Sequence, residues 1–417
     1  MMTELPLFRE DFLWGAATSA HQVEGNNINS DLWIAEHIQP TLFVEPSLDA
    51  CDHYHRFPSD IRLLADLGLN TYRFSIEWAR VEPERGHFSE AALDHYRRML
   101  EACRENGVKP MVTLYHFSSP RWFAGMGGWE ARGAADLFVR YAERVARHMG
   151  DSIAVASTFN EPNMPALLEW VPKTGIPLTT LFQMRRKAAK AIGTGTFGCF
   201  FLGDPRKLEQ TMIAAHHRAR AAMKACPGSY PIGLNISLQD EQAVGAKSKR
   251  DTKCAKVYHA WMDAANASDF LGVQVYTRCR VGKSGDLAPE EGVELTQMGY
   301  EFWPEALETC LRYAAGRVSV PLYVTENGIA TEDDSRRIEY IRRAVAGMAN
   351  CVADGMDIRG YIHWTLMDNF EWIFGYRPKF GLLTRDRHIK PSAHYLGEIA
   401  RSHGASLAAA VRQNRLK

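Results

Sequence analysis

The stretch "SIAVASTFNEP", Ser152 to Pro162, joins a short apolar run to a polar cluster that contains a carboxylate. The amphipathic stretch "GAADLFVRYAERVARHMG" precedes it, and another helical region follows near Leu208–Ala225. Apolar runs that alternate with period-3.6 helical stretches indicate a parallel sheet covered by helices. The stretch therefore predicts one strand of an α/β fold, with Glu161 at the carboxyl end of that strand.

The same alternation runs along the whole chain. Eight apolar runs are each followed by helical material, at Phe12–Ser19, Thr71–Ile76, Lys109–His116, Ser152–Glu161, Pro231–Ser237, Phe270–Thr277, Pro321–Gly328 and Arg359–Leu366. Eight such units fit a closed (β/α)8 TIM barrel. An open doubly wound sheet would place a Gly-rich phosphate turn after its first strand, and "SAHQVEG" is not one. Because no linker is visible, we expect a single domain over 1–417.

Composition narrows the possible functions. Lys plus Arg and Asp plus Glu each number 49, so the sequence predicts neither a nucleic-acid nor a membrane partner. The eight cysteines form no CxxC pair, which is typical of reduced thiols in a cytosolic protein. The first residues show no basic start followed by an apolar run, so we expect no secretory signal and a cytoplasmic location. The oligomeric state is left open.

Polar residues stand where the predicted strands end, which is the functional face of such a barrel. They are His21, Gln22, Glu24, Arg73, Glu77, Trp78, His116, Asn160, Glu161, Tyr276, Glu326, Asn327, Trp364, Asp368, Asn369, Glu371 and Trp372. A barrel with a purely structural role would not need this gathering.

Glu161 and Glu326 end the fourth and seventh predicted strands and should face each other across the barrel mouth. Two facing carboxyl groups suit glycoside hydrolysis, in which one acts as acid and the other as nucleophile or base. A lone glutamate here would more simply be a solvated loop acid. The pair, each followed by a turn-forming residue, favours the catalytic interpretation. Pro162 also predicts an extended backbone at Glu161.

Three neighbours could serve this pair. Arg73 lies within an apolar strand, where a buried guanidinium needs an acidic partner. Its role is either to form a purely structural ion pair or to lie near Glu326 and keep that carboxylate ionised. The Tyr276 hydroxyl could act similarly, and Asn160 could bind a sugar hydroxyl. His21 and His116 share the rim with several acids, but no HxxxH or HxH pair lies on a predicted catalytic strand, and the histidines of "DHYHRF" (52–57) are interpreted as loop residues. We therefore predict no metal and no cofactor.

The motifs together resemble glycoside hydrolase family 1, the retaining β-glycosidases. The resemblance extends from "FLWGAATSAHQVEG" to "IKPSAHYL", through "YRFSIEW", "TFNEP", "YVTENG" and "HWTLMDNFEWIFGYRPKFGL". It implies that Glu161 is the acid/base, with a raised pKa, and Glu326 the nucleophile, with a low pKa. Arg73 and Tyr276 would hold the nucleophile, and Asn160 the sugar 2-hydroxyl. Further substrate-binding residues would be Gln22, His116, Trp364, Glu371, Trp372, Phe117 and Phe380.

The implied activity is hydrolysis of β-glucosides, with β-fucosides and β-galactosides as further substrates. Family members that act on 6-phosphorylated sugars usually lack the acid found here at Glu371, so unphosphorylated substrates are expected. Two alternatives stay open: a transglycosidase that passes glucose to an apolar alcohol, and a non-catalytic sugar-binding relative.

Three departures from the family pattern stand out. The chain has "QVY" at Gln274–Tyr276 and "HFSSP" after the third strand, where Phe117 would contact the sugar's 6-position. The largest departure is an apolar and basic insertion at about 164–205. It is either a helix packed outside the barrel or, as we expect, partly a roof over the leaving-group subsite that favours a bulky apolar aglycone.

Overall fold

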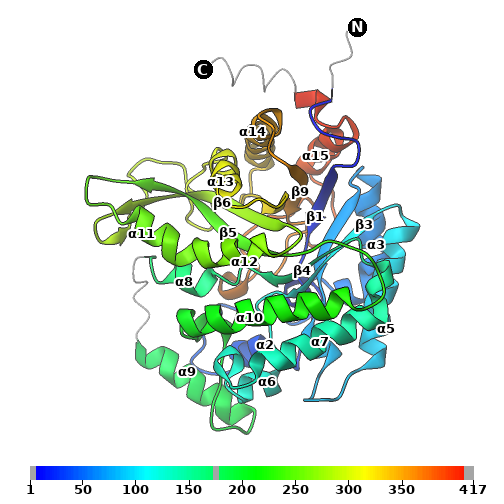
Figure 1. Ribbon diagram of the computed structural model, residues 1–417, viewed down its shortest axis with the longest axis vertical. Helices are drawn as coiled ribbons and strands as arrows, with labels where there is room; N and C mark the ends of the chain where they lie inside the picture. The colour runs from blue at the N-terminus through cyan, green and yellow to red at the C-terminus, as the bar shows by residue number, and fades with distance from the viewer. Residues whose placement is uncertain (1–5, 172–177, 408–417) are drawn as a thin grey trace.

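The computed structural model describes residues 6–171 and 178–407, and its centre is a closed barrel of eight parallel strands (Figure 1). The strands run in the order β1-β2-β3-β4-β5-β6-β8-β9, and β9 pairs with β1 to close the ring. They are β1 (Leu13–Ala17), β2 (Thr71–Ser75), β3 (Lys109–Tyr115), β4 (Val155–Asn160), β5 (Ile232–Ala243), β6 (Leu271–Gly282), β8 (Leu322–Asn327) and β9 (Ile358–Trp364). The predicted (β/α)8 TIM barrel is confirmed.

Helices surround the barrel and connect its strands. They are α1 (Ala20–Val23), α2 (Asp31–His37), α3 (His53–Asp66), α4 (Trp78–Val81), α5 (Glu90–Glu105), α6 (Arg121–Gly125), α7 (Ala134–Met149), α8 (Met164–Leu168), α9 (Leu178–Ala191), α10 (Pro205–Lys224), α11 (Arg250–Cys254), α12 (Ala260–Asn266), α13 (Ala306–Ala315), α14 (Asp334–Ala353) and α15 (Pro391–Arg401). None of the helices within the described ranges is long and apolar enough to cross a membrane.

Helix α7 shows how the sequence builds the helical layer. Its buried residues recur every three or four positions, and Phe138, Tyr141 and Val145 face the barrel. On the opposite side, Arg147 donates to Glu143 one turn earlier. This apolar stripe packs α7 against the strands and leaves the charged face in water. Residues at the carboxyl ends of the strands are thereby held on a rigid frame.

The strands β5 and β6 differ from their predicted lengths, because both continue beyond the barrel. They were expected to end at Ser237 and Thr277, but they remain paired as far as Ala243 and Val281. In the extension Asp240 lies opposite Arg278, so opposite charges pair across a ribbon that is only partly buried. Such a charged stretch lacks the apolar signal of a core strand, which explains the early predicted ends. The two-residue strand β7 (Gly285–Asp286) pairs antiparallel to β6.

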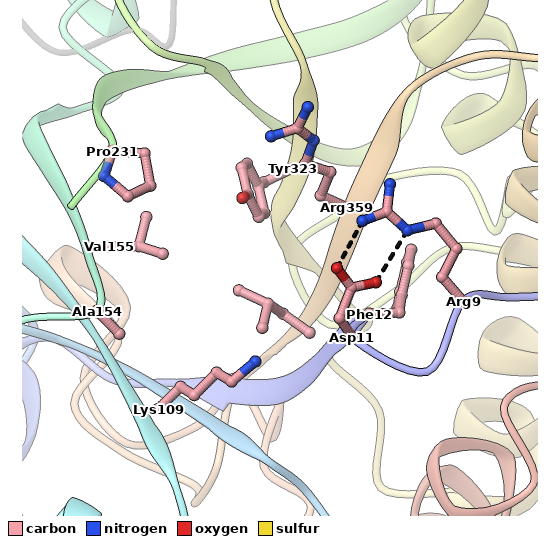
Figure 2. Close-up of a pocket in the computed structure, with 10 residues that line it drawn as sticks. Arg9, Asp11, Phe12, Lys109, Ala154, Val155, Pro231, Tyr323 and Arg359 are labelled. Atoms are coloured by element: carbon pink, nitrogen blue, oxygen red, sulfur yellow. Dashed lines mark hydrogen bonds and ion pairs between the residues drawn. The ribbon is translucent and has the colours of Figure 1, made fainter. Parts of the chain in front are cut away.

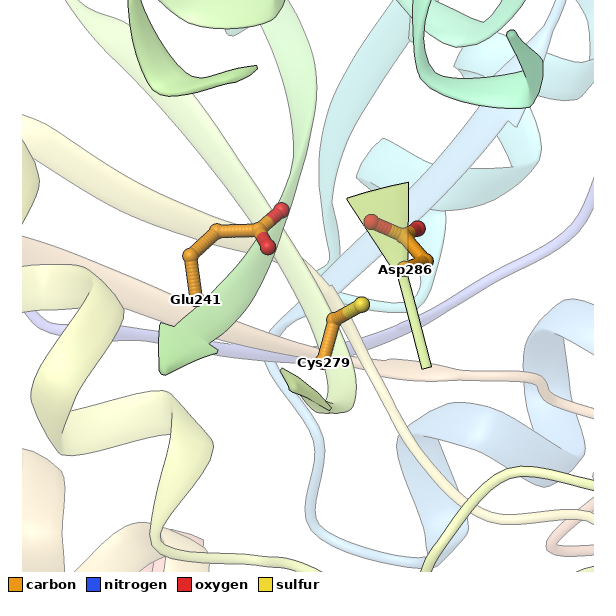
Figure 3. A group of neighbouring side chains, drawn as sticks. All are labelled: Glu241, Cys279 and Asp286. Carbon is orange, nitrogen blue, oxygen red and sulfur yellow. The ribbon is translucent and has the colours of Figure 1, made fainter. Parts of the chain in front are cut away.

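The extension contains a cluster of possible metal ligands, Glu241, Cys279 and Asp286 (Figure 3). The buried ammonium group of Lys253 lies 2.8 Å from Glu241 Oε1 and 2.9 Å from both carboxylate oxygens of Asp286. It also lies 3.4 Å from Cys279 Sγ. The lysine supplies the positive charge that these acids need, so the cluster is explained as a buried ion-pair network.

The amino ends of the strands surround a pocket of about 370 Å³ (Figure 2). Arg9, Asp11 and Lys109 line it together with Tyr323 and Arg359. Arg9 forms two hydrogen bonds with Asp11, and both side chains are largely exposed. The pocket therefore lies at the end of the barrel opposite the predicted catalytic residues.

All eight cysteines are free thiols, and all but Cys279 are buried. Burial raises the pKa of Cys103 to about 12 and that of Cys254 to about 11. The thiols act here as small apolar side chains of the core.

Candidate active site

The predicted site residues meet at the carboxyl end of the barrel. Each of them contacts at least one other member of the group, apart from Glu161, which interacts electrostatically with Glu326. The members are Gln22, Arg73, His116, Phe117, Asn160, Glu161, Tyr276, Glu326, Trp364, Glu371, Trp372 and Phe380. Seven strands or the loops after them contribute, so only the closed barrel can assemble the group.

Glu326 is held by two side chains. Arg73 Nη1 on β2 donates to Glu326 Oε1 at 2.6 Å, and the Tyr276 hydroxyl on β6 donates to Oε2 at 2.6 Å. The Arg73 and Glu326 side chains are only 1% and 5% exposed. Both carboxylate oxygens are thus bonded and their direction is set, which is what an in-line attack on a bound sugar would require.

Glu161 sits directly after β4 in a different setting. Its side chain is buried, and none of the residues that the structure describes forms an ion pair with it. Its φ of 43° is left-handed, so the extended backbone predicted from Pro162 is wrong. The Glu161 amide donates to Asn235 O at 2.8 Å, and this bond holds the turn in place. The strained turn directs the carboxyl group into the barrel mouth.

The two carboxyl groups differ in proton affinity. Burial raises the pKa of Glu161 to about 8, and the nearby charge of Glu326 acts in the same direction. Burial also raises the pKa of Glu326, while the Arg73 guanidinium and the Tyr276 hydroxyl act to lower it. The low pKa expected for Glu326 is therefore wrong, because burial outweighs these contacts. Among the described residues only Glu326 has a cation in contact, and this contact favours Glu161 as the holder of a single proton shared by the pair.

Asn160 connects the nucleophile region to the sugar-binding side. Its Oδ1 accepts from Arg73 Nη2 at 2.5 Å and from Gln274 Nε2 at 2.8 Å, and its Nδ2 lies 3.2 Å from His116 Nε2. Burial and the charge of Arg73 hold the pKa of His116 well below its usual range, so the ring is neutral. Within the described part of the chain, His116 Nδ1 is buried without a hydrogen-bond partner. A neutral ring with one free nitrogen is suited to a sugar hydroxyl.

Gln22 and Glu371 form a second polar group beside an aromatic wall. Gln22 Nε2 donates to Glu371 Oε2 at 3.2 Å and to the carbonyl of Phe370 at 2.8 Å. Burial raises the pKa of Glu371 to about 8, and the charge of Glu326 contributes. The ring of Trp364 lies nearly parallel to that of His116, with centroids 5.7 Å apart. Aromatic faces beside carboxyl and amide groups are typical of sugar sites.

Phe380 completes this wall. Its ring meets that of Tyr276 edge to face, with centroids 5.9 Å apart.

The insertion reaches this site through its last residues. Phe200 and Phe201 contact Phe117, with ring centroids 5.4 and 4.9 Å apart, and Phe117 also meets Trp372 at 5.4 Å. Earlier in the insertion, α9 packs outside the barrel beside α2. The outside packing therefore applies to α9, whereas the roof over the leaving-group subsite stays a prediction for the residues near Phe200 and Phe201. Residues 172–177 lie outside the described residues.

Sequence reasoning missed several residues that support the site. Gln274 had been noted only as a departure, yet its side chain is buried and bonded to Asn160. His21, which was expected on the rim, lies behind the site: its ring stacks on Trp372 with centroids 5.8 Å apart, and its Nε2 lies 2.7 Å from Glu36 Oε1. The motif resemblance points to residues that touch substrate, and it gives no signal for residues behind them.

Comparisons with known proteins agree with this geometry. The sequence profile of Glycosyl hydrolase family 1 matches residues 5–195 and 204–405. A solved apo structure of a β-glucosidase designated 1317 is 49% identical with a TM-score of 0.91, covering 94% of this chain and 98% of that chain. The structure of a β-glycosidase named BGL167 is 48% identical with a TM-score of 0.90, covering 95% and 97%. A bifunctional β-D-glucosidase/β-D-fucosidase of Bifidobacterium breve is 31% identical over 90% of this chain and 93% of its own.

The barrel and these matches define an enzyme of the glycoside hydrolase class. Within that class the chain belongs to glycosyl hydrolase family 1, because the family profile covers nearly all of it. The non-catalytic alternative is thereby set aside. The profile leaves residues 196–203 unmatched but covers residues 164–195, so it matches most of the segment that was expected to be an insertion.

Proposed function

We propose that this chain is a retaining β-glycosidase that hydrolyses unphosphorylated β-glucosides, within a single catalytic domain. The observation that carries the proposal is the unequal environment of two buried carboxyl groups. Glu326 is bonded through both oxygens to Arg73 and Tyr276, whereas Glu161 lacks a cation and has a pKa of about 8. Two carboxyl groups whose environments separate their pKa values suit the roles of nucleophile and acid.

The residues suggest a two-step reaction. The carboxylate of Glu326 attacks the anomeric carbon while neutral Glu161 gives its proton to the glycosidic oxygen, and the aglycone leaves. Glu161, now a carboxylate, then takes a proton from water as the water attacks the glycosyl ester, which releases the sugar and free Glu326. Arg73 stabilises Glu326 whenever Glu326 is ionised, and we assign Asn160 Nδ2 to the sugar 2-hydroxyl.

The sugar class follows from the polar group beside Trp364. Gln22, His116 and Glu371 offer donors and acceptors for the outer sugar hydroxyls, and Trp364 and Phe380 offer apolar ring faces. The family resemblance assigns Glu371 to the position that would meet a 6-phosphate, and both the size and the residual charge of its carboxyl would oppose an anion there. The Bifidobacterium relative is named for glucosides and fucosides, which supports including β-fucosides, and β-galactosides remain part of the proposal.

The leaving-group side is proposed to be apolar. Phe200 and Phe201 contact Phe117, the residue expected at the sugar's 6-position, and we assign these two rings to the leaving-group side. Aryl or other apolar aglycones would remove this surface from water, whereas a second glucose would leave its hydroxyls facing aromatic rings. We expect a higher kcat/KM for aryl glucosides than for cellobiose, and the opposite ranking would contradict this part of the proposal.

The decisive experiment replaces the nucleophile. We expect Glu326→Ala to lower kcat on an aryl β-glucoside by at least about 10⁴-fold, since no covalent intermediate can form. Added azide should restore turnover and yield the α-glycosyl azide, identified by NMR. For the wild-type enzyme, NMR of the first product should show the β-anomer. Initial release of the α-anomer would falsify retention, and a fully active Glu326→Ala would exclude its role.

A further inference from the structure

Helix α9 presents an unusual charge pattern at its surface. The chain has no acidic residue from Trp170 to Gly203, although its total charge is balanced. Four basic residues lie on α9, and all four are exposed: Arg185, Arg186, Lys187 and Lys190. Such a one-sided concentration of cations on a neutral protein is expected of a surface that meets anions.

Among the described residues, three of the four cations of α9 are also free of partners, whereas Arg185 donates to the carbonyl of Phe197. Within the described ranges, Arg186, Lys187 and Lys190 form neither an ion pair nor a side-chain hydrogen bond. The acids of the adjoining helix α2 do not compensate them, because both are buried and bonded elsewhere. Asp31 accepts from the amide of Ser119, and Glu36 is bonded to His21.

By contrast, each of the four arginines of α14 has an acidic partner. The pairs are Arg336–Glu294, Arg337–Asp334, Arg342–Glu339 and Arg343–Glu305. The positive charge of α9 is therefore not the ordinary state of an arginine-rich helix in this protein.

Apolar side chains are exposed next to these cations. Phe182 is 68% exposed, and the spacing of four places it on one face of α9 with Arg186 and Lys190. Val44, 72% exposed, directly follows Phe43, which packs against the same apolar cluster as α9. These are the two most exposed large apolar side chains among the described residues. Basic residues beside an exposed aromatic ring are the composition of helices that lie on anionic bilayers.

The opposite face of α9 fixes it firmly to the barrel. Met184, Ala188 and Ala189 are buried, and the two alanines belong to a cluster with Leu32 of α2 and Phe197. Trp372 of the active site packs against the same cluster. In Figure 1, α9 lies at the end of the molecule opposite α15. A surface that contacted α9 would therefore be close to the mouth of the barrel.

We propose that α9 docks this enzyme onto an anionic lipid surface, with Arg186, Lys187 and Lys190 facing the lipid headgroups and Phe182 entering the interface. A bilayer is favoured over an acidic protein or polysaccharide because the exposed phenyl ring has no use in a purely ionic contact. The contact would be peripheral and sensitive to salt. It departs from the absence of a membrane partner predicted from the balanced total charge, because the total hides the local excess of cations on α9. Docking stands apart from catalysis, so its test does not depend on the glycosidase proposal.

Vesicle co-sedimentation of the full chain tests the docking. We expect binding to phosphatidylglycerol–phosphatidylcholine vesicles at low ionic strength, release by added salt, and little binding to phosphatidylcholine alone. The triple variant Arg186→Gln, Lys187→Gln, Lys190→Gln should lower the partition coefficient about 100-fold, since each basic residue at an anionic surface contributes about fivefold. Phe182→Ala should weaken the binding that persists at intermediate salt.

A matched control separates this site from net charge. Helix α5 carries Arg97, Arg98 and Arg104 among four acidic residues, so changing these three arginines to Gln removes equal charge from a balanced surface. We expect this control to bind vesicles as the wild type does, and all variants to keep wild-type kcat on a soluble aryl glucoside. The docking proposal is wrong if the wild type does not bind anionic vesicles. It is also wrong if the α9 and α5 triple variants lose vesicle binding to the same extent. Binding to immobilised polyglutamate without binding to vesicles would also overturn it.

Discussion

The two ends of the barrel carry the same kind of ion pair in opposite surroundings. At the carboxyl end, Arg73 and Glu326 are bonded with side chains 1% and 5% exposed. At the amino end, Arg359 and Asp357 are bonded at 2.7 Å with side chains 43% and 48% exposed. Figure 2 shows Arg359 beside a second exposed pair, Arg9 and Asp11. The chemistry of the groups is equal, and only the access of water differs.

Burial turns the same groups from surface charges into reactive ones. An exposed pair is screened by water and contributes about 0–1 kcal/mol to stability. A buried carboxyl instead changes its pKa, as the value of about 8 for Glu161 shows. The pocket at the amino end is a visible hollow, but its charges are solvated, and the contact with Arg9 lowers the pKa of Asp11 instead of raising it, so this acid holds no proton to give at neutral pH.

The sharpest way to test this comparison removes one acid at each end. Glu161→Ala should lower kcat/KM about 10³- to 10⁴-fold for alkyl glucosides, because the leaving group is no longer protonated. The loss should be much smaller for dinitrophenyl glucosides, which leave without a proton. Asp11→Ala at the amino end should leave both rates unchanged. Equal losses for the two leaving groups would show that Glu161 is not the acid.

The next test removes one arginine at each end. Arg73→Met should lower kcat/KM about 100-fold and destabilise the fold by about 3–5 kcal/mol, since it leaves Glu326 buried without its cation. It should also raise the pKa of Glu326, so the fall in kcat/KM on the acid side should move to higher pH. A pH profile together with urea unfolding measures both effects. If the fall in kcat/KM at low pH stayed at the wild-type pH, Arg73 would not influence the ionisation of Glu326.

The pH profile of the wild type sharpens the comparison further. Glu161 must hold a proton in order to act as acid, so kcat/KM should be high below its pKa of about 8 and fall tenfold per unit above it. Glu326 must be ionised, so the rate should also fall as the pH drops through its pKa. In Glu161→Ala the alkaline fall should disappear. If kcat/KM of Glu161→Ala still fell at alkaline pH, that fall would have to come from the titration of another group.

The smallest effect is expected at the amino end. Arg359→Met should change the free energy of unfolding by less than about 1 kcal/mol, because the pair with Asp357 is exposed. The loss should shrink further in high salt. Urea unfolding at two salt concentrations measures this, and kcat/KM should equal that of the wild type. A loss as large as that of Arg73→Met would contradict the role assigned to burial.

The sequence predicts the barrel because its signal is local and repeated. Apolar runs such as "TYRFSI" and "PLYVTENG" end within two residues of the observed strands β2 and β8. The facing glutamates were predicted for a related reason: the barrel puts every strand end on one rim, so Glu161 and Glu326 lie on that rim whatever the loops do. The sugar-binding roles came from the family resemblance instead.

The failures arise where tertiary surroundings decide. The φ of Glu161 depends on a bond to Asn235 on the neighbouring strand, and Pro162 alone suggested the opposite conformation. The pKa of Glu326 depends on how much burial opposes Arg73, which no motif records. The extensions of β5 and β6 are stabilised by each other beyond the core, and their charged residues resemble a loop.

The free cysteines have a practical consequence for experiments on this enzyme. Seven of the eight are buried, and burial raises thiol pKa values, to about 12 for Cys51 and Cys199. Thiol reagents act on exposed thiolates, so the native cysteines should react little with a labelling reagent. A fluorophore attached to Phe182→Cys would then report from α9 alone. Its emission on adding vesicles would place that helix in water or in lipid without altering any native cysteine.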